Sequence, residues 1–262
     1  MLYLSPAITV YFCVLAALLG ACVGSFLNCM AWRIVHGEPI TKGRSHCDAC
    51  GHVLSAADLV PVVSFLAHRG KCRYCGAKLS RRHLWGEILS ALTFVALLLK
   101  YDISLQTLEY LLFASLLLGC AFADLEGYMI PDRFILAGIM LRIPFFFLLP
   151  DWKGQVLDAG IGGFAIGGGL LLIVLAYEKI RRVEAMGGGD LKLLFLTGLY
   201  LGWQRNLLCL FFACILGIVV GLATAKKREE KLFPWGPSIA AGAILSVLCG
   251  SELISAYLGL FG

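Results

Sequence analysis

Long apolar segments constrain this chain more than any other feature of its sequence. A helix needs about 20 mostly apolar residues to cross the roughly 30 Å hydrocarbon core of a bilayer. We predict membrane-spanning helices over residues 7–32, 84–99, 105–123, 134–149, 156–177, 191–203, 207–225 and 237–260. The sixth of these segments is short, so seven spans is the alternative count. Because 60% of the residues are apolar and only 15% are charged, we predict an all-α polytopic membrane protein with about eight transmembrane helices, and we expect no nucleic-acid partner.

The basic residues are unevenly distributed between the two sides of this predicted membrane domain. Most Lys and Arg residues lie in three segments, at residues 33–82, 179–192 and 226–231. With eight spans, these segments fall on one side, and the loops of the opposite side hold Lys100, Lys153 and Arg205. The positive-inside rule then predicts that the three basic segments are cytoplasmic and that both termini lie outside.

Four cysteines in the one long polar segment have the spacing of a metal site. Cys47, Cys50, Cys72 and Cys75 form two C-x-x-C pairs, each followed by a glycine that permits a tight turn around the thiolates. This pattern predicts a four-thiolate zinc site in a small zinc-ribbon-like cytoplasmic loop domain. Two disulfides and a rubredoxin-like iron site are the alternatives, and a reducing cytoplasm disfavours the disulfides. Because sulfur would fill all four coordination positions, we expect the zinc to be structural.

Two acidic residues lie at the predicted ends of membrane segments, where charges are costly. Asp124 closes the third span in FADLEGYMIP, and Asp190 opens the sixth in MGGGDLKLLF. The loop pattern puts both at the cytoplasmic boundary. Paired carboxylates share a proton, so that one acts as a base on water while the other donates a hydrogen bond to a substrate carbonyl. This is the chemistry of an aspartic protease, although an interfacial acid at Asp124 and a helix N-cap at Asp190 are simpler alternatives.

The residues around Asp190 fit an approach by an extended peptide. Gly187, Gly188 and Gly189 leave the backbone bare beside this carboxylate. Lys192 follows closely, and its ammonium group could stabilise the anionic carboxylate or bind a lipid phosphate.

Small and acidic residues elsewhere in the spans predict helix packing. Gly20 and Gly24 form a G-x-x-x-G pair, which is typical of close helix contacts, and the glycine-rich stretch at 160–169 predicts a second packing face. Glu87 is either a buried acid or an ion-pair partner of a neighbouring arginine, Arg81 or Arg82. All five histidines lie in or beside the polar segment, so the spans offer no histidine for a serine or cysteine protease.

Together these motifs resemble those of the type IV prepilin peptidases, a bacterial branch of the G-x-G-D intramembrane aspartyl proteases. The matching motifs cover nearly the whole chain and are GSFLNCMAWR at 24–33, the paired C-x-x-C motifs at 47–75, GE at 86–87, DLEGYMIPD at 124–132, GGGDLKLL at 187–194 and PWGP at 234–237. The resemblance implies that Asp124 and Asp190 are the catalytic pair. It also implies three domains: a first transmembrane helix at 1–32, a zinc-binding loop domain at 33–83 and a peptidase membrane domain at 84–262.

The resemblance further implies a substrate and a second activity. Members of this family remove a basic leader from type IV prepilins or type II secretion pseudopilins, after a glycine at the cytoplasmic face of the bacterial inner membrane. Many then methylate the new N-terminus with S-adenosylmethionine. We expect the leader to contact Glu126, Asp132 and Glu184. The chain departs from the family by the IVHG that follows Arg33, where a proline is common, and by PWGP in place of PFGP.

A membrane scaffold or transporter with a zinc-ribbon docking loop is the competing hypothesis. Ion-coupled transport predicts acidic residues deep in several spans, and the predicted spans contain few.

Overall fold

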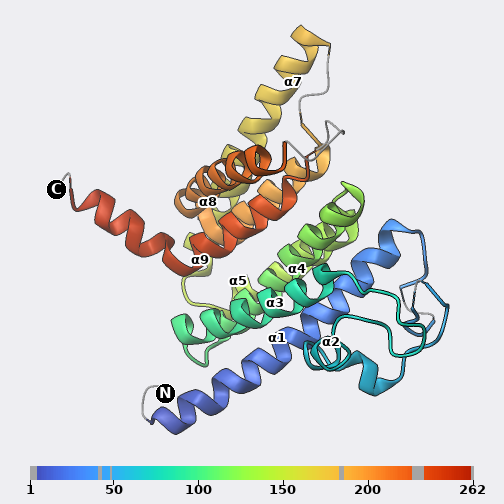
Figure 1. Ribbon diagram of the computed structural model, residues 1–262. Helices are drawn as coiled ribbons and strands as arrows, with labels where there is room; N and C mark the ends of the chain where they lie inside the picture. Colours follow the sequence, from blue (N-terminus) through green and yellow to red (C-terminus); the bar gives the residue numbers. More distant parts are fainter. Residues whose placement is uncertain (1–4, 41–42, 48, 183–185, 226–232, 261–262) are drawn as a thin grey trace. The chain divides into compact units, whose positions relative to one another are not determined.

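The computed structural model describes residues 5–40, 43–47, 49–182, 186–225 and 233–260 (Figure 1). The helices of this part, in chain order, are α1 (Pro6–Val35), the 3₁₀ turn η2 (Ala56–Leu59), α2 (Val63–Ala67), α3 (Arg81–Tyr101), α4 (Leu105–Gly127), α5 (Asp132–Leu148), α6 (Trp152–Ile161), the π-helix η3 (Gly162–Gly168), α7 (Gly169–Arg181), α8 (Gly188–Ala225) and α9 (Gly236–Leu258). Extended pairing in the described ranges is limited to two isolated β-bridges. The all-α fold class is therefore confirmed.

Six helical runs in the described residues are long and apolar enough to cross a membrane. They are α1, α3, α4, the continuous run Trp152–Arg181, α8 and α9. The predicted count of eight spans is not confirmed. The difference has two sources: α5 has only 17 residues, and α8 contains both the sixth and the seventh predicted segments.

The two predicted segments within α8 meet at a break in the helix. Gly202 has φ 72° and ψ 179°, a conformation outside the helical region that glycine adopts without a Cβ clash. The carboxylate of Asp158 accepts a 3.2 Å hydrogen bond from the N–H of Trp203, just after the break. The sequence boundary between these segments therefore corresponds to a real break in the helix, although not to a loop.

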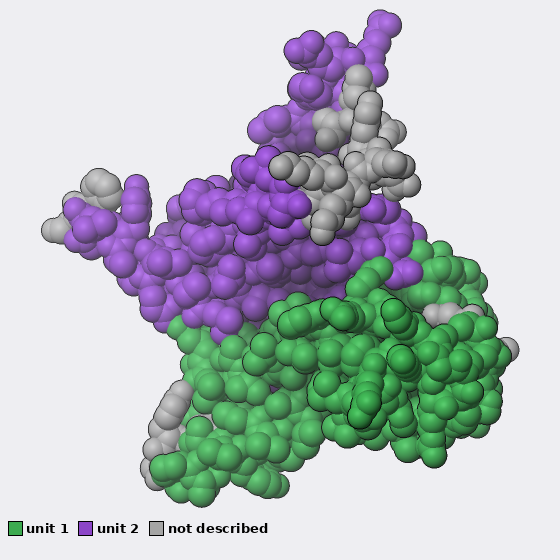
Figure 2. Space-filling view, viewed as in Figure 1, with its two compact units in different colours: residues 1–107 green, residues 108–262 purple. Residues whose placement is uncertain are grey.

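The chain forms two compact units, Met1–Thr107 and Leu108–Gly262, coloured separately in Figure 2. The first unit contains α3 as well as the predicted zinc-binding loop, because α3 packs along α1 (Figure 1). A Cβ built on Gly20 would lie 2.7 Å from the carbonyl oxygen of Ser90, and one on Gly24 would lie 2.5 Å from the Ser90 hydroxyl. The predicted close packing at this G-x-x-x-G pair is confirmed.

The second unit packs its glycine-rich stretch against α8. A Cβ on Gly162 would lie 2.7 Å from the carbonyl oxygen of Gly198, and one on Gly167 would lie 3.1 Å from Cα of Phe195. At these positions the predicted packing face is confirmed. By contrast, a Cβ on Gly169 would meet nothing within 4 Å.

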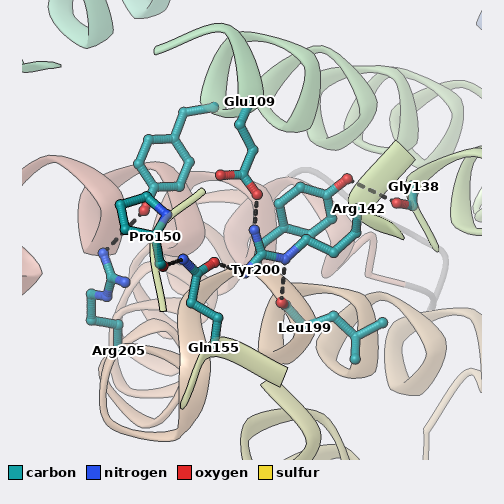
Figure 3. Close-up of polar contacts among 9 residues, drawn as sticks. Glu109, Gly138, Arg142, Pro150, Gln155, Leu199, Tyr200 and Arg205 are labelled. Carbon is teal, nitrogen blue, oxygen red and sulfur yellow. Dashed lines mark hydrogen bonds and ion pairs between the residues drawn. The ribbon is translucent and has the colours of Figure 1, made fainter. Parts of the chain in front are cut away.

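A buried ion pair lies inside the second unit (Figure 3). Arg142 of α5 and Glu109 of α4 are 6% and 2% exposed and pair with each other. The Arg142 guanidinium also donates to the carbonyl of Leu199 in α8 at 3.0 Å and to the side chain of Gln155 in α6 at 3.4 Å. Because buried charges need partners, these contacts hold four helices together at one place.

Candidate active site and metal centre

Asp124 lies in the last turn of α4 and is buried. Its Oδ2 accepts a 2.8 Å hydrogen bond from the backbone N–H of Gly236, the first residue of α9. The first N–H groups of a helix have no partner within the helix, so they are available to a carboxylate. A Cβ on Gly236 would lie 2.8 Å from the same oxygen, which explains why glycine is needed there.

Asp190 lies in the first turn of α8, half-buried. Its N–H donates to the carbonyl of Gly187 at 3.1 Å. The Asp124 and Asp190 carboxylates are close enough to interact electrostatically. The second unit therefore brings the two predicted acids together, one at the end of α4 and the other at the start of α8, and the start of α9 contacts the first of them.

The three glycines before Asp190 have different surroundings. A Cβ on Gly189 would lie 3.0 Å from Cβ of Ile130, so this glycine allows α8 to start close to the segment between α4 and α5. A Cβ on Gly187 would lie 3.3 Å from a carboxylate oxygen of Asp190, whereas one on Gly188 would meet nothing within 4 Å. Among the described residues, the space next to Gly188 is therefore open, and access of a substrate peptide there stays a prediction.

Lys192 and Asp132 form an ion pair with each other. The Lys192 Nζ and the Asp132 Oδ1 are 2.7 Å apart, and the two side chains are 52% and 63% exposed. The pair connects the start of α8 to the start of α5. Of the other acids predicted to meet a leader, Glu126 is half-buried in the last turn of α4, and Glu184 lies outside the described residues.

The PWGP motif contributes a contact that the sequence analysis missed. Gly236 of this motif donates the hydrogen bond to Asp124. The sequence signal that could have indicated this contact was a glycine in a short segment with a proline at each end. Trp235 fixes the same turn, because its indole Nε1 donates to the carbonyl of Ala213 in α8 at 3.1 Å. A phenylalanine has no such donor, so the departure from PFGP adds a hydrogen bond.

The four cysteines of the polar loop form a cluster that can hold a metal. The Sγ atoms of Cys47, Cys50, Cys72 and Cys75 all lie within 4.8 Å of one another. Those of Cys47 and Cys75 are 3.8 Å apart. A tetrahedral zinc with Zn–S bonds of about 2.3 Å separates its sulfurs by about 3.8 Å, so the donor set fits this ion.

Both C-x-x-C-G motifs have the same backbone geometry. Gly51 and Gly76 have φ values of 69° and 72°. Their N–H groups donate to the carbonyls of Cys47 and Cys72 at 2.7 and 2.9 Å. The predicted tight turns after each cysteine pair are confirmed, and glycine is required there because of the positive φ.

These turns also change the acidity of the thiols. Backbone N–H groups of Cys75 and, to a lesser extent, Tyr74 lower the pKa of the Cys72 thiol to about 7. For Cys75 the Ala77 N–H acts in the same direction, but burial and the three neighbouring thiols outweigh it and raise the pKa to about 11. One thiol thus ionises readily while its neighbour retains its proton, and a bound cation would favour the thiolate form of all four.

Comparison with known proteins gives consistent matches along the chain. Residues 18–101 match the Bacterial Peptidase A24 N-terminal domain, and residues 111–222 match the Type IV leader peptidase family. A protein of Bacillus subtilis (strain 168) named Prepilin leader peptidase/N-methyltransferase is 33% identical over 91% of this chain and 95% of its own length. Proteins with the same name from Pseudomonas putida (30%, covering 96% of both chains) and Myxococcus xanthus (36%, covering 80% of this chain and 62% of the relative) are also similar. No solved structure matches.

Proposed function

Because the chain belongs to the type IV leader peptidase family, we propose that it is a membrane aspartic endopeptidase that removes the leader from type IV prepilins or type II secretion pseudopilins. It cleaves after a glycine at the cytoplasmic membrane boundary and then N-methylates the new terminus with S-adenosylmethionine. The observation that carries the peptidase proposal is that the Asp124 and Asp190 carboxylates, at the end of α4 and the start of α8, lie close enough to interact electrostatically.

The mechanism follows from two carboxylates that share one proton. The ionised carboxylate takes a proton from a water molecule as the water oxygen attacks the scissile carbonyl carbon, and the protonated partner donates to the carbonyl oxygen. Return of a proton to the amide nitrogen then releases the new N-terminus. In this scheme the Gly236 N–H orients Asp124 by holding its Oδ2.

The acids at the site offer a surface for a basic leader. Asp132 already pairs with Lys192, so a leader would have to compete with that lysine. Glu126 lies two residues beyond Asp124 at the end of α4, and we propose it as the principal leader contact among the described acids. Glu184 is proposed on the sequence alone.

The orientation in the membrane is inferred from charge. The family and the apolar helices support a multi-pass inner-membrane protein. With the eight spans predicted from the sequence, the three basic segments fall on one side of the membrane. We propose that this side is cytoplasmic and holds the active site, with both termini in the periplasm. The four cysteines then lie in the cytoplasm, where we propose that they hold one structural zinc ion. The scaffold or transporter hypothesis is not favoured, because the relatives are named as peptidases.

The experiment is cleavage in a reconstituted membrane. Purified protein in liposomes is mixed with a substrate that has a basic leader, a Gly–Phe junction and an apolar helix. Mass spectrometry measures loss of the leader and, after addition of S-adenosylmethionine, a methyl group on the new N-terminus. We expect both products. A substrate in which the junction glycine is replaced by a bulky residue is the control, and an uncut glycine substrate contradicts the proposal.

A further inference from the structure

The break in α8 at Gly202 separates two backbone groups, and each of them has a side-chain partner. In a continuous helix the N–H of Trp203 would donate to the carbonyl of Leu199, four residues earlier. Here the Asp158 carboxylate of α6 accepts from that N–H at 3.2 Å. The Leu199 carbonyl accepts from the Arg142 guanidinium of α5 at 3.0 Å (Figure 3). An anion thus lies at the start of one half of α8 and a cation at the end of the other, which are the charges that helix ends favour.

The break makes the position of Asp190 depend on the angle between the two halves of α8. Asp190 precedes Gly202 by 12 residues, which is about 18 Å along a helix, so a tilt of about 5° at the break would move it by about 1.6 Å. A shift of about 1 Å in a catalytic group can cost roughly 100-fold in rate. Backbone hydrogen bonds fix this angle in a continuous helix. At a break, contacts with other groups must do so.

Asn206 supplies contacts of this kind from the second half of α8 (203–225). It is fully buried, four residues beyond Gly202. Its amide nitrogen donates to the carbonyl of Leu194, in the first half of α8 (188–201), at 3.2 Å, and to that of Gly162, where η3 begins, at 3.0 Å. Its Oδ1 lies 2.7 Å from the hydroxyl of Thr197, also in the first half. Because an amide oxygen can only accept, the hydroxyl is the donor. Asn206 therefore joins the two halves of α8 to each other and to η3.

Burial of this amide has a cost that an apolar residue would avoid. Polar groups are expensive to bury unless they are paired, and within membrane segments they mark functional positions. The Thr197 hydroxyl does not depend on Asn206 for a partner, because the Leu194 carbonyl of its own helix lies 2.9 Å away. A leucine at position 206 would bury its side chain without a polar group. The amide therefore points to a need for a fixed geometry at this place.

The π-helix η3 supports the break from the other side. A Cβ on Gly162 would lie 2.6 Å from the carbonyl carbon of Gly202, so η3 and the break are in contact backbone to backbone. Short π-helical segments within helices are rare and frequently occur at functional sites. The backbone of η3 blocks a tilt of the first half of α8 toward it, and the hydrogen bonds of Asn206 oppose a tilt away from it.

We propose that Asn206 is a positioning residue for peptide cleavage, an inference that rests on the proposed peptidase function. By fixing the angle between the two halves of α8, it keeps Asp190 beside Asp124. Thr197 assists by holding the Asn206 amide in one orientation. Both residues act through the backbone of α8, and their printed hydrogen bonds include neither aspartate.

The first test measures cleavage in liposomes, with kcat expressed per folded protein and at a temperature well below the Tm of each variant. Asn206→Leu and Thr197→Val should each lower kcat at least tenfold, because a small displacement of Asp190 is costly. KM should stay within about twofold, since the proposed leader contact, Glu126, lies on α4. Thr197→Ser keeps the hydroxyl and should restore kcat. The Thr197 pair of variants decides the question if Asn206→Leu does not fold.

The matched control is Thr93→Val, the same substitution at a buried threonine of another span. The hydroxyl of Thr93 donates to the carbonyl of Leu89 in its own helix, α3, at 2.8 Å. This variant should keep the unmodified kcat. A loss of kcat in Thr93→Val equal to that in Thr197→Val would overturn the inference, because removal of any buried hydroxyl would then suffice.

The second test measures the geometry without any cleavage. In a protein with Asp124→Cys and Asp190→Cys, a short bifunctional thiol reagent should join the two new cysteines, and mass spectrometry of the linked peptides gives the yield. Addition of Asn206→Leu should lower this yield at least threefold, whereas addition of Thr93→Val should not change it. A residue that only stabilises the fold would lower Tm and leave the yield unchanged.

Two results overturn the inference even if Tm falls: a kcat within about twofold of the unmodified value in both Asn206→Leu and Thr197→Val, or a cross-link yield that Asn206→Leu does not change. If the unmodified protein cleaves the substrate and either result is found, only this inference fails. If the unmodified protein does not cleave, the proposed function fails, and the cross-link yield alone then tests the role of Asn206 in the position of Asp190.

Discussion

The backbone N–H of Gly236 donates a 2.8 Å hydrogen bond to the carboxylate of Asp124. This contact joins the end of α4 to the start of α9, two positions far apart in the sequence. The proposed catalytic acid is therefore positioned by a second helix, α9, as well as by its own. The bond also gives the PWGP motif a physical role, since only glycine lets the backbone come so close to the carboxylate.

Substitution of Gly236 by alanine should impair cleavage. The added Cβ would lie 2.8 Å from the Asp124 Oδ2, so the carboxylate or the helix must move. A shift of about 1 Å in a catalytic group can cost roughly 100-fold in rate, and we expect at least a tenfold lower kcat in the liposome assay. Gly169→Ala, where a Cβ meets nothing within 4 Å, is the control. Full activity of Gly236→Ala speaks against a positioning role.

Removal of one cysteine should release the metal. Metal analysis of the purified protein should find about one equivalent of zinc, and Cys72→Ser should lose it, because structural zinc needs all four thiolates. Cys214→Ser, at an exposed cysteine far along the chain from the cluster, should keep the zinc. A Cys72→Ser protein that retains stoichiometric zinc contradicts the four-cysteine site.

The buried and exposed ion pairs should differ in their contribution to stability. Arg142→Leu leaves Glu109 buried without its partner, and loss of one member of a buried pair costs about 3–5 kcal/mol. Asp132→Asn breaks the exposed pair with Lys192, and such pairs contribute about 0–1 kcal/mol. Thermal unfolding in detergent should show a large fall in Tm for the first variant and almost none for the second. Equal falls in Tm for the two variants would contradict the expected difference between a buried and an exposed ion pair.

Charge reversal should separate the two acids proposed to meet the leader. Glu126→Lys should raise KM for a substrate with a basic leader, with a smaller effect on a substrate whose leader is neutral. Asp132→Lys should have a weaker effect on KM, because that carboxylate is already paired with Lys192. Unchanged KM in both variants rejects an electrostatic contact with the leader.

The sequence predicted those features that depend on local pattern. Apolar segments predicted helices, and C-x-x-C-G predicted a clustered metal site because its turn geometry is contained in five residues. The count of spans was less predictable. Around Gly202 the chain forms a broken helix rather than a loop, and a residue distant in sequence, Asp158, accepts a hydrogen bond from the Trp203 N–H at the break. Long-range contacts were not predictable either: nothing local connects Gly236 to Asp124, or the Val62 N–H to the Glu87 carboxylate that accepts its hydrogen bond.

Side-chain pairing likewise depended on contacts between residues that are far apart in the sequence. Lys192 was expected beside Asp190 because the two are neighbours in sequence, yet its partner is Asp132. The start of α5 supplies this partner, and its position relative to α8 is a property of the packed unit. Glycine packing at Gly20 and Gly24 was predictable because two glycines four residues apart lie on the same face of a helix, where they permit close contact.

The central claim is that Asp124 and Asp190 act as one catalytic pair. The most direct measurement is cleavage of the Gly–Phe substrate in liposomes by Asp124→Asn, by Asp190→Asn and by the double variant, with Asp151→Asn, at an exposed aspartate of the same unit, as the matched control. Each single variant should lose activity by a factor of about 1,000 or more, and the double variant should be no worse than either, because residues that act as a unit are not additive. Cleavage near the unmodified rate in either single variant contradicts the account.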